Sequence, residues 1–358
     1  MYLISCDFAS HERDFFYSYV WVYSDCMNLI INPSDIYYLT GVRSHDPGEI
    51  MILLKKKEEK WVNFISSRKE KYGIILCDPR TSGLFDAEQY EIMDDRKLWG
   101  KTLSQFKTLS ADPDFLAQSL RAKIEWYGPR LVMKKSPIIE KRLIKTSWEI
   151  ELLRTSQTLN KRVYDMILPF LVPWVTEEAI ARRIQILQLE LGATGPSFPP
   201  IVAFGENSAI PHHSPTERKL QWDDVVLIDM GLVWRGYCSD MTRMVYQDGI
   251  PDEARKIGEL ITHVTQEIIQ WAKPGMKVAD IDKKARKMLW KYEQYFTHSL
   301  GHWVGIDIHE APHVSGKSRE ILEPGMIITI EPGIYIAGKY GARYEEMCVV
   351  GNKELEVF

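Results

Sequence analysis

The sequence predicts an α+β fold in two parts, a smaller α/β domain followed by a larger domain built from two similar halves. Three observations predict it. The length of 358 residues exceeds the roughly 100 to 200 residues of one domain. The first third carries short apolar runs, and the remainder repeats a pattern of two helices and a strand pair. Because the pattern changes near Lys134 and Lys135, we predict domains over 1–135 and 136–358.

In the first domain, apolar runs are separated by Gly, Pro and charged clusters. This pattern is typical of alternating strands and helices around a mixed α/β layer. The runs cover 27–33, 36–41, 49–57, 61–67 and 72–80.

The first half of the second domain begins with two helices. Thr146 and Glu149 form a capping box that opens a helix ending near Pro169. Thr176 is the predicted N-cap of the second helix, which stops at Gly192. A strand over 201–206, a His-containing loop and a hairpin pairing 224–234 with 237–246 follow.

The second half repeats this order. A helix is predicted over 251–273, and Asp280 is expected to cap another that ends near Tyr292. A Gly-broken, His-rich segment and a strand pair, 325–336 with 342–350, complete the repeat. A pseudo-two-fold arrangement would bring the acids of the two hairpins together.

Composition excludes several classes of protein. Lys and Arg number 45 against 49 Asp and Glu, a net charge of -4. Sequence-independent binding to nucleic-acid phosphates needs more basic than acidic residues, so a nucleic-acid-binding protein of that kind is not expected. A small molecule or a peptide is the expected partner.

The cysteine count and the hydropathy of the sequence indicate where in the cell the protein is expected. The five cysteines form no C-x-x-C pair, and the odd count fits neither a disulfide framework nor a thiolate zinc site. The first residues lack the basic flank of a signal peptide, and no run approaches the roughly 18 to 20 apolar residues of a membrane span. We therefore expect a soluble cytoplasmic protein with no membrane partner.

Acidic residues in the first hairpin share one face. A two-residue turn over 235–236 sets a register in which Asp229 faces Thr242 and Asp240 faces Gly231. The aspartates are then diagonal neighbours, with Cα atoms roughly 7 to 8 Å apart, and could bind a common ion.

The second hairpin carries Glu331 and Glu345 in matching positions, flanked by apolar residues. Either acid alone could lie on an exposed sheet face. Buried together, the four acids would need cations, and the nearby strands supply only Arg243 and Arg343 as permanent charges. Hard divalent metal ions would provide the missing charge.

Histidines concentrate in the same region, since seven of the nine lie between His212 and His313. His298, His302 and His309 share the Gly-broken segment, where imidazoles are candidate metal ligands. A single histidine there could also be a hydrogen-bonded core residue. His263 falls on a predicted helix and is interpreted as an ordinary helix residue.

Several strings resemble the pita-bread metallopeptidases, the superfamily of methionine aminopeptidase, aminopeptidase P and prolidase. They are PHHSPTERKLQWDDVVLIDMG, CSDMTR, HSLGHWVGIDIHEAP, LEPGMIITIEPGIYI and GARYEE, and the resemblance extends from about Lys145 to the last residue. The stretch with IYYLTG resembles the creatinase-like N-terminal domain of the proline-directed branch. Metal ligands implied by the resemblance are Asp229, Asp240, His302, Glu331 and Glu345.

The resemblance also implies a mechanism. Two divalent ions, with manganese expected and cobalt, iron or zinc as alternatives, would activate water and polarise the scissile carbonyl. Asp240 would bridge the ions and Glu331 would accept a proton. A homodimer is implied as well. Substrate-handling roles fall to His212 and His309, with His298 as a weaker candidate and Arg343 as a group that orients a carboxylate ligand or substrate.

Two neighbouring residues compete for ligand roles. Strand parity with Arg343 and the family's G-x-R-x-E pattern select Glu345 over Glu346, which would support the site from outside. Cys238 shares parity with Asp240, but a small buried apolar role is the preferred interpretation.

Departures from the family bear on the substrate. Trp303 after the metal histidine resembles aminopeptidase P, and prolidases often carry an Arg where His313 stands. Without that Arg, the carboxylate of a dipeptide loses a bidentate partner. We therefore expect an Xaa-Pro aminopeptidase, acting on peptides with proline in second position. The alternatives are an Xaa-Pro dipeptidase (prolidase), a metal-free creatinase-like enzyme and a non-catalytic peptide-binding protein.

Overall fold

The chain separates into two compact units, residues 1–142 and 143–358. The computed structural model describes residues 27–30, 32–40, 52–55, 73–76, 90–93, 99, 103–104, 108–114, 116, 118–134 and 136–358. The predicted apolar run at 61–67 lies outside these residues.

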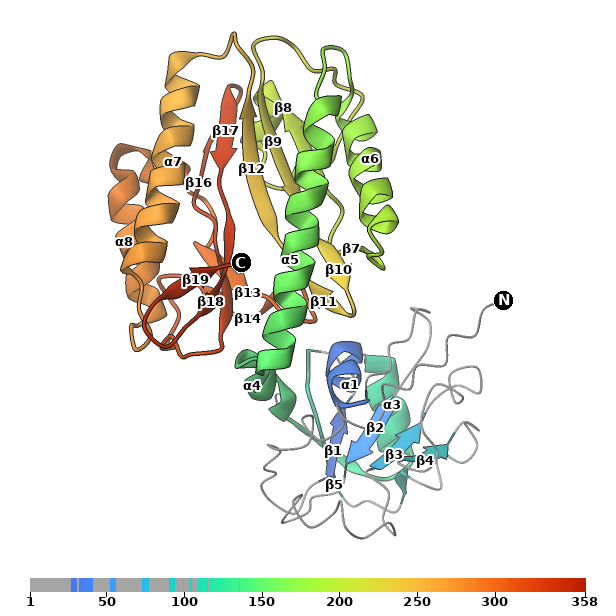
Figure 1. The fold of residues 1–358 in the computed structure, drawn as a ribbon. Coiled ribbons are helices and arrows are strands. Elements are labelled where there is room, and N and C mark those ends of the chain that lie inside the picture. The colour runs from blue at the N-terminus through green and yellow to red at the C-terminus, as the bar shows by residue number, and fades with distance from the viewer. Residues whose placement is uncertain are drawn as a thin grey trace. The chain divides into compact units, whose positions relative to one another are not determined.

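The first unit contains a mixed six-stranded sheet in the order β4-β3-β2-β1-β5-β6 (Figure 1). The pairs β1–β2 and β2–β3 are antiparallel, whereas β1–β5, β3–β4 and β5–β6 are parallel. Its elements are β1 Met27–Ile30, α1 Pro33–Thr40, β2 Ile52–Lys55, β3 Gly73–Leu76, β4 Tyr90–Met93, β5 Thr108–Ala111, α3 Gln118–Trp126, β6 Arg130–Met133 and α4 Pro137–Leu143.

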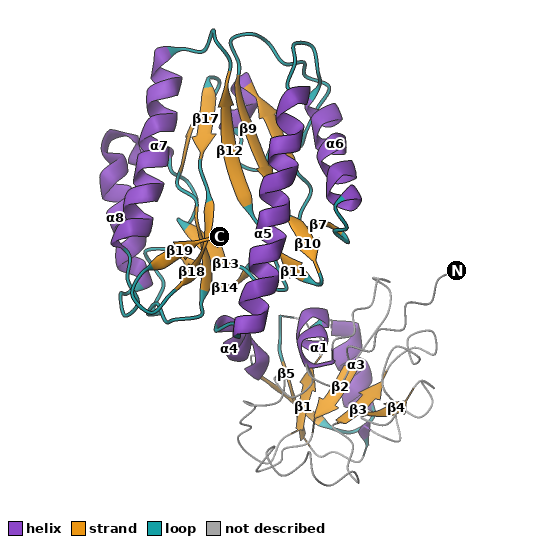
Figure 2. Cartoon of the chain, viewed as in Figure 1, coloured by secondary structure: helices purple, strands orange, loops and turns teal. Residues whose placement is uncertain are grey.

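Two helix pairs flank the strands of the second unit (Figures 1 and 2). Helices α5 and α6 pack on one group of strands, and α7 and α8 pack on the other. The helices are α5 Ser147–Ile167, α6 Glu177–Glu190, α7 Asp252–Trp271 and α8 Val278–Leu289, with 3-10 turns η3 Leu168–Phe170, η4 Gly205–Ala209 and η5 Trp290–Tyr295.

The strands of this unit form four small sheets in the orders β12-β9-β8, β11-β10-β7, β14-β13-β15-β18-β19 and β16-β17. Their bounds are β7 Gly195–Pro196, β8 Ile201–Phe204, β9 Val225–Met230, β10 Leu232–Trp234, β11 Tyr237–Cys238, β12 Met241–Tyr246, β13 Gly301–Trp303, β14 Glu310–Val314, β15 Ile327–Ile330, β16 Gly333–Ile336, β17 Tyr340–Arg343, β18 Glu346–Val350 and β19 Leu355–Val357.

Helix ends in this unit largely follow their sequence signals. The capping box of Thr146 and Glu149 is present, and Thr176 caps α6 by accepting a bond from the Ala179 N–H. The helix predicted after Asp280 is present as α8, but its predicted cap is wrong, because Lys277 occupies the N-cap and Asp280 lies inside the first turn. The backbone of Lys277 pairs with Ile321, so a distant segment determines where this helix begins.

Both predicted hairpins are interrupted at the acids. In the first, Thr242 pairs with Asp229 as predicted, but the ladder opens at Gly231 and Asp240 before β10 and β11 pair. In the second, β15 pairs with β18 and β16 with β17, which leaves Glu331 and Glu345 in the gap. Each hairpin, predicted as one continuous pair, is therefore two short pairs. Asp240 lies where the first hairpin separates, next to the paired Asp229, and Glu331 and Glu345 lie where the second separates.

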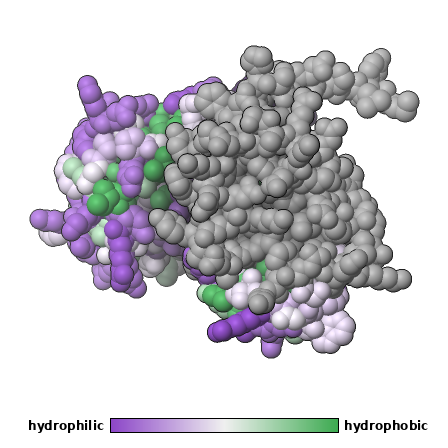
Figure 3. Space-filling view, turned by 90° about the horizontal axis from the view of Figure 1, so that it is seen from below, coloured by the Kyte–Doolittle hydropathy of each residue, from purple (hydrophilic) through white to green (hydrophobic). Residues whose placement is uncertain are grey.

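Where residues are coloured on the face shown in Figure 3, hydrophilic side chains predominate, with smaller hydrophobic areas between them. No helix among the described residues combines the length and the apolar character needed to cross a membrane.

Candidate metal centre and active site

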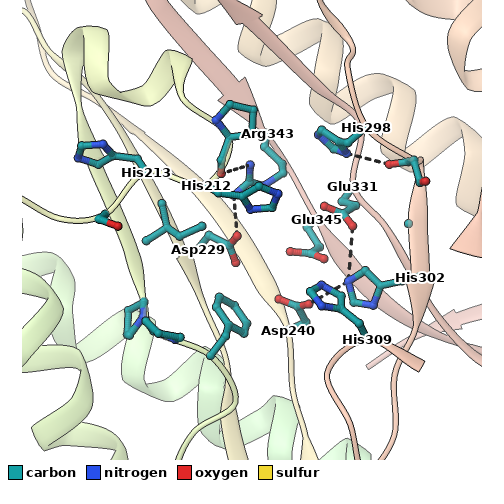
Figure 4. A pocket seen from close by; sticks show the side chains of 18 of the residues that line it. His212, His213, Asp229, Asp240, His298, His302, His309, Glu331, Arg343 and Glu345 are labelled. Carbon is teal, nitrogen blue, oxygen red and sulfur yellow. Dashed lines mark hydrogen bonds and ion pairs between the residues drawn. The ribbon is translucent and has the colours of Figure 1, made fainter. Parts of the chain in front are cut away.

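A cavity of about 550 Å³ opens in the second unit, where the interrupted hairpins meet. Acids, histidines and one arginine line it together with an apolar group that includes Phe198, Pro199, Pro200 and Ile201. Figure 4 shows the carboxylates of Asp229, Asp240, Glu331 and Glu345 gathered beside His302 and His309. All nine residues predicted for the site line this cavity: His212, Asp229, Asp240, His298, His302, His309, Glu331, Arg343 and Glu345.

Three of the predicted ligands form a tight group. One ligand atom each of Asp240, His302 and Glu345 lies within 4.8 Å of the others, and all three residues are buried. His302 Nε2 lies 3.2 Å from Asp240 Oδ2 and 3.5 Å from Glu331 Oε1. Glu331 therefore joins the group through the same imidazole nitrogen.

The backbone around His302 orients its ring. Its Nδ1 lies 3.2 Å from the Trp303 carbonyl, and its backbone N–H donates to Thr329 Oγ1 at 3.1 Å. When Nδ1–H donates to that carbonyl, Nε2 has a free lone pair that faces the carboxylates, which is the arrangement of a metal-binding histidine.

Arg343 joins the two halves of the unit at Asp229. Its NH2 group donates to Asp229 Oδ2 at 2.5 Å, and its Nε donates to Thr242 Oγ1 at 3.0 Å. Its NH1 group donates to the Tyr335 hydroxyl at 2.7 Å and to the Pro211 carbonyl at 3.2 Å. Since Arg343 is 3% exposed, its guanidinium is committed to protein acceptors.

Glu345 occupies the centre of the group. Its Oε2 accepts a hydrogen bond of 2.9 Å from the Thr242 hydroxyl, and its backbone N–H donates to the Thr242 carbonyl at 3.2 Å. These two bonds link the gap of the second hairpin to strand β12 of the first.

Burial and mutual repulsion perturb these acids. Burial, then repulsion from Asp229 and Glu331, raises the pKa of Asp240 well above its usual range. Burial, then repulsion from Asp240 and Asp229, does the same to the pKa of Glu345. Burial and the charge of Glu345 raise the pKa of Glu331 to about 8. The positive charges of the protein therefore do not balance the negative charges of Asp240, Glu331 and Glu345.

The donor set fits divalent cations. Asp229 Oδ1 and Glu345 Oε1 are buried and, within the described part of the chain, have no hydrogen-bond partner. Such oxygens are costly to bury unless something else binds them. Four carboxylates and an imidazole suit manganese, cobalt, iron or zinc. The residues present could therefore hold the metal ions expected from the sequence.

The other histidines form the wall of the cavity. The His309 ring meets the His302 ring edge-on at 4.4 Å. Partial burial and the neighbouring His302 lower the pKa of His309 to about 4, so it is neutral at pH 7. His298 Nε2 lies 2.9 Å from the Tyr335 hydroxyl, and burial followed by the charge of Arg343 lowers the pKa of His298 to about 4. His212 is exposed at the cavity.

Residues considered as competitors lie elsewhere. Glu346 accepts from Arg243 at 2.6 Å and from the Tyr344 hydroxyl at 2.8 Å, outside the cavity lining. Cys238 is buried, and its thiol donates to the Ile306 carbonyl. His263 is exposed on α7.

Two residues of the site were not predicted from the sequence. Tyr335 bridges His298 and Arg343, and strand parity with Gly333, which pairs with Arg343, could have placed it on this face. His213 is buried, with its Nε2 2.9 Å from Glu177. No local sequence pattern predicts that contact, because Glu177 lies at the start of α6, 36 residues earlier in the chain.

Comparison with known proteins agrees with this geometry. Residues 151–352 match metallopeptidase family M24. An uncharacterized peptidase of Staphylococcus aureus is 32% identical over 334 residues, which cover 92% of this chain and 93% of that protein.

Solved structures with similar folds include two proline peptidases. An Xaa-Pro dipeptidase from Bacillus anthracis has a TM-score of 0.83 at 27% identity, covering 92% of both chains. An X-Pro aminopeptidase from Thermotoga maritima has a TM-score of 0.80 at 25% identity, covering 93% of this chain and 94% of that one. The chain belongs to metallopeptidase family M24, the pita-bread peptidases.

Proposed function

We propose that the chain is a dinuclear metal-dependent Xaa-Pro aminopeptidase, which releases the N-terminal residue from peptides with proline in second position. The observation that carries the proposal is the convergence of four acids and one imidazole on one cavity. Among the described residues, Asp229 and Glu345 each have a buried carboxylate oxygen there without a hydrogen-bond partner.

The proposed ligands are Asp229, Asp240, His302, Glu331 and Glu345. Two divalent ions held there would act as Lewis acids on water and on the scissile carbonyl. Manganese is the proposed metal because carboxylate-rich sites suit it, and metal analysis would distinguish cobalt, iron or zinc.

The protein's own groups supply proton transfer and orientation. Glu331 takes the proton of the attacking water and delivers it to the leaving imide nitrogen. His309 donates from its neutral imidazole to one substrate carbonyl oxygen and His212 contacts a second, which suits proline because its nitrogen has no proton to offer. Arg343 holds Asp229 in place through the contact described above.

Arg343 also supports the choice of aminopeptidase over dipeptidase. A dipeptidase needs a cation for the carboxylate of its substrate. Among the described residues lining the cavity, Arg343 alone carries a permanent positive charge, and protein acceptors already engage its guanidinium. The second candidate, an Xaa-Pro dipeptidase, is favoured by the similarity to the Bacillus anthracis enzyme.

Substrate length separates the two candidates. We expect Xaa-Pro-Xaa tripeptides to be cleaved with higher kcat/KM than Xaa-Pro dipeptides, measured with the manganese-loaded protein. Replacing the proline of the tripeptide with alanine should remove most of the rate. A tenfold preference for dipeptides, about 1.4 kcal/mol in transition-state binding, would overturn the aminopeptidase assignment.

Metal content separates an enzyme of this class from a binding protein. Purified protein should take up two manganese ions per chain, measured by elemental analysis, and chelation should abolish turnover. A protein that binds no stoichiometric metal yet retains peptide affinity would be a non-catalytic binding protein.

A further inference from the structure

The strand ladder of the first hairpin opens at a candidate ligand. Met230 still pairs with Met241, and Val233 pairs with Cys238, but Gly231 and Asp240 between them do not pair. A β-carbon on Gly231 would lie 2.0 Å from the Ser239 carbonyl oxygen, so glycine is required at this close approach. The buried backbone groups of Asp240 must therefore find partners outside the ladder.

Gln157, on the buried face of α5, supplies both partners. Its Nε2 donates to the Asp240 carbonyl at 2.8 Å, and the Asp240 N–H donates to its Oε1 at 3.3 Å. A residue pair in a β-ladder exchanges hydrogen bonds in the same way. The side-chain amide of Gln157 thus replaces a missing strand partner, 83 residues away in the chain.

Two neighbouring side-chain amides, one on α5 and one on α6, make fewer hydrogen bonds than Gln157 does. Asn160 donates to the Met230 carbonyl and Gln188 donates to the Gly231 carbonyl, both at or near the same gap. Among the described residues, their own amide oxygens are buried without a partner. Gln157 is fully buried and satisfied at both ends, which distinguishes it from a side chain that merely fills the gap.

We propose that Gln157 is a positioning residue that holds Asp240 in the geometry needed to bind metal. The bonds to the N–H and C=O of Asp240 fix the two peptide planes on either side of its Cα, and so the direction of its Cα–Cβ bond. That direction brings the carboxylate to 3.2 Å from His302. The inference rests on the proposed function, because it gives Gln157 a role only if Asp240 is a ligand.

The test compares two Gln→Met substitutions, which keep side-chain length and remove the amide. Manganese affinity of the metal-free protein, measured by calorimetric titration, should fall at least tenfold in Gln157→Met. The kcat at saturating manganese should fall with little change in KM. The matched control is Gln188→Met, which removes an equally buried amide that bonds Gly231 instead, and should lower thermal stability but keep manganese affinity within about twofold of wild type.

The outcomes separate this inference from the proposed function. Equal loss of manganese affinity in both variants, or none in Gln157→Met, would overturn the role of Gln157 while leaving the metal site intact. A wild-type protein without manganese affinity would overturn the proposed function itself.

A measurement on the wild type covers the case in which Gln157→Met does not fold. Hydrogen exchange resolved at single amides should show the Asp240 N–H as protected as the paired amides of β12. Fast exchange at Asp240 in the native protein would also overturn the proposal.

Discussion

Single residues in the cavity differ in how firmly the protein holds them. The His302 ring is oriented at Nδ1 by a carbonyl and at Nε2 by two acids. His309 touches the same ring edge-on but lies exposed at the cavity. A side chain that is oriented before any ion arrives suits a ligand, and one with freedom suits contact with a substrate.

Asp240→Ala should remove peptidase activity while the fold remains. The change deletes a charge from a site rather than apolar volume from the core. We expect kcat/KM to fall more than about 100-fold, beyond the usual loss for a residue that only supports a ligand. Steady-state kinetics with added manganese measures this, and Asp248→Ala, at an exposed acid, is the control. Near-normal turnover in Asp240→Ala would refute the ligand assignment.

The histidines should separate into two functional groups. His302→Ala should lower metal occupancy, whereas His309→Ala and His212→Ala should retain metal and lose turnover. Elemental analysis beside kinetics distinguishes the groups, and His263→Ala, exposed on α7, should change neither quantity. If all three cavity variants lost metal equally, the division into ligands and wall would be mistaken.

At the scale of elements, the start of α6 organises the loop that carries His212. Glu177, its first residue, accepts hydrogen bonds from the Phe204 N–H at 2.8 Å and the Thr216 hydroxyl at 2.7 Å. The same carboxylate lies 2.9 Å from His213 Nε2. One buried acid thus ties a strand end, the loop and the helix together.

Glu177→Gln should lower the free energy of unfolding by roughly 2 to 3 kcal/mol. An amide cannot accept all the bonds that the carboxylate accepts, and charge-assisted bonds are the stronger kind. Chemical denaturation measures the change. The adjacent Glu178→Gln is the control, because that side chain is 40% exposed and pairs only with Arg182 on the surface among the described residues. Equal effects of the two substitutions would argue against the organising role.

The same carboxylate makes stability depend on acid pH. Burial opposes its charge, but hydrogen bonds from Thr216, His213 and the Phe204 N–H outweigh burial and lower its pKa from 4.5. The folded state then binds this proton less tightly than the unfolded chain, so the stabilisation is present above about pH 4.5 and lost as pH falls. The stability gap between wild type and Glu177→Gln should narrow below that pH, and a constant gap down to pH 3 would contradict this.

Local signals predicted the elements that depend on neighbours in sequence. The caps of α5 and α6 and the pairing of Asp229 with Thr242 depend on residues within one helix end or one turn. The start of α8 and the gaps in both hairpins depend on distant contacts, so periodicity could not reveal them. Nine of the residues that line the cavity were predicted from their resemblance to family motifs, whereas Gln157 was not, because its partner lies 83 residues away.

On the scale of the second unit, the cavity is where its two halves join. Asp229 and Asp240 come from the first half, and His302, Glu331 and Glu345 from the second. Direct bonds cross between the halves at the same place, from Arg343 to Asp229 and from Thr242 to Glu345. Metal bound there would stabilise the folded unit, since the unfolded chain cannot assemble the set.

Removing metal should therefore lower Tm, and more so at higher pH. In the metal-free protein the raised pKa values mean that the folded state holds protons that the unfolded chain releases. Its stability then falls as pH rises from about 4.5 toward the Glu331 pKa of about 8. Calorimetry with and without chelator at pH 5, 6.5 and 8 measures the widening gap, and restoring manganese should reverse it. An unchanged Tm at pH 8 would show that no metal stabilises the fold.

The interrupted hairpins also bear on the order of folding. Each gap on its own offers an incoming ion two carboxylates at most, while the full donor set exists only after the halves have docked. Closing the long stretch of chain between Asp229 and Glu345 costs entropy that the ion cannot offset in advance. Manganese present from the start of refolding should then leave the folding rate unchanged and slow only unfolding. Tight metal binding would therefore follow the rate-limiting step of folding and would not form part of the folding nucleus.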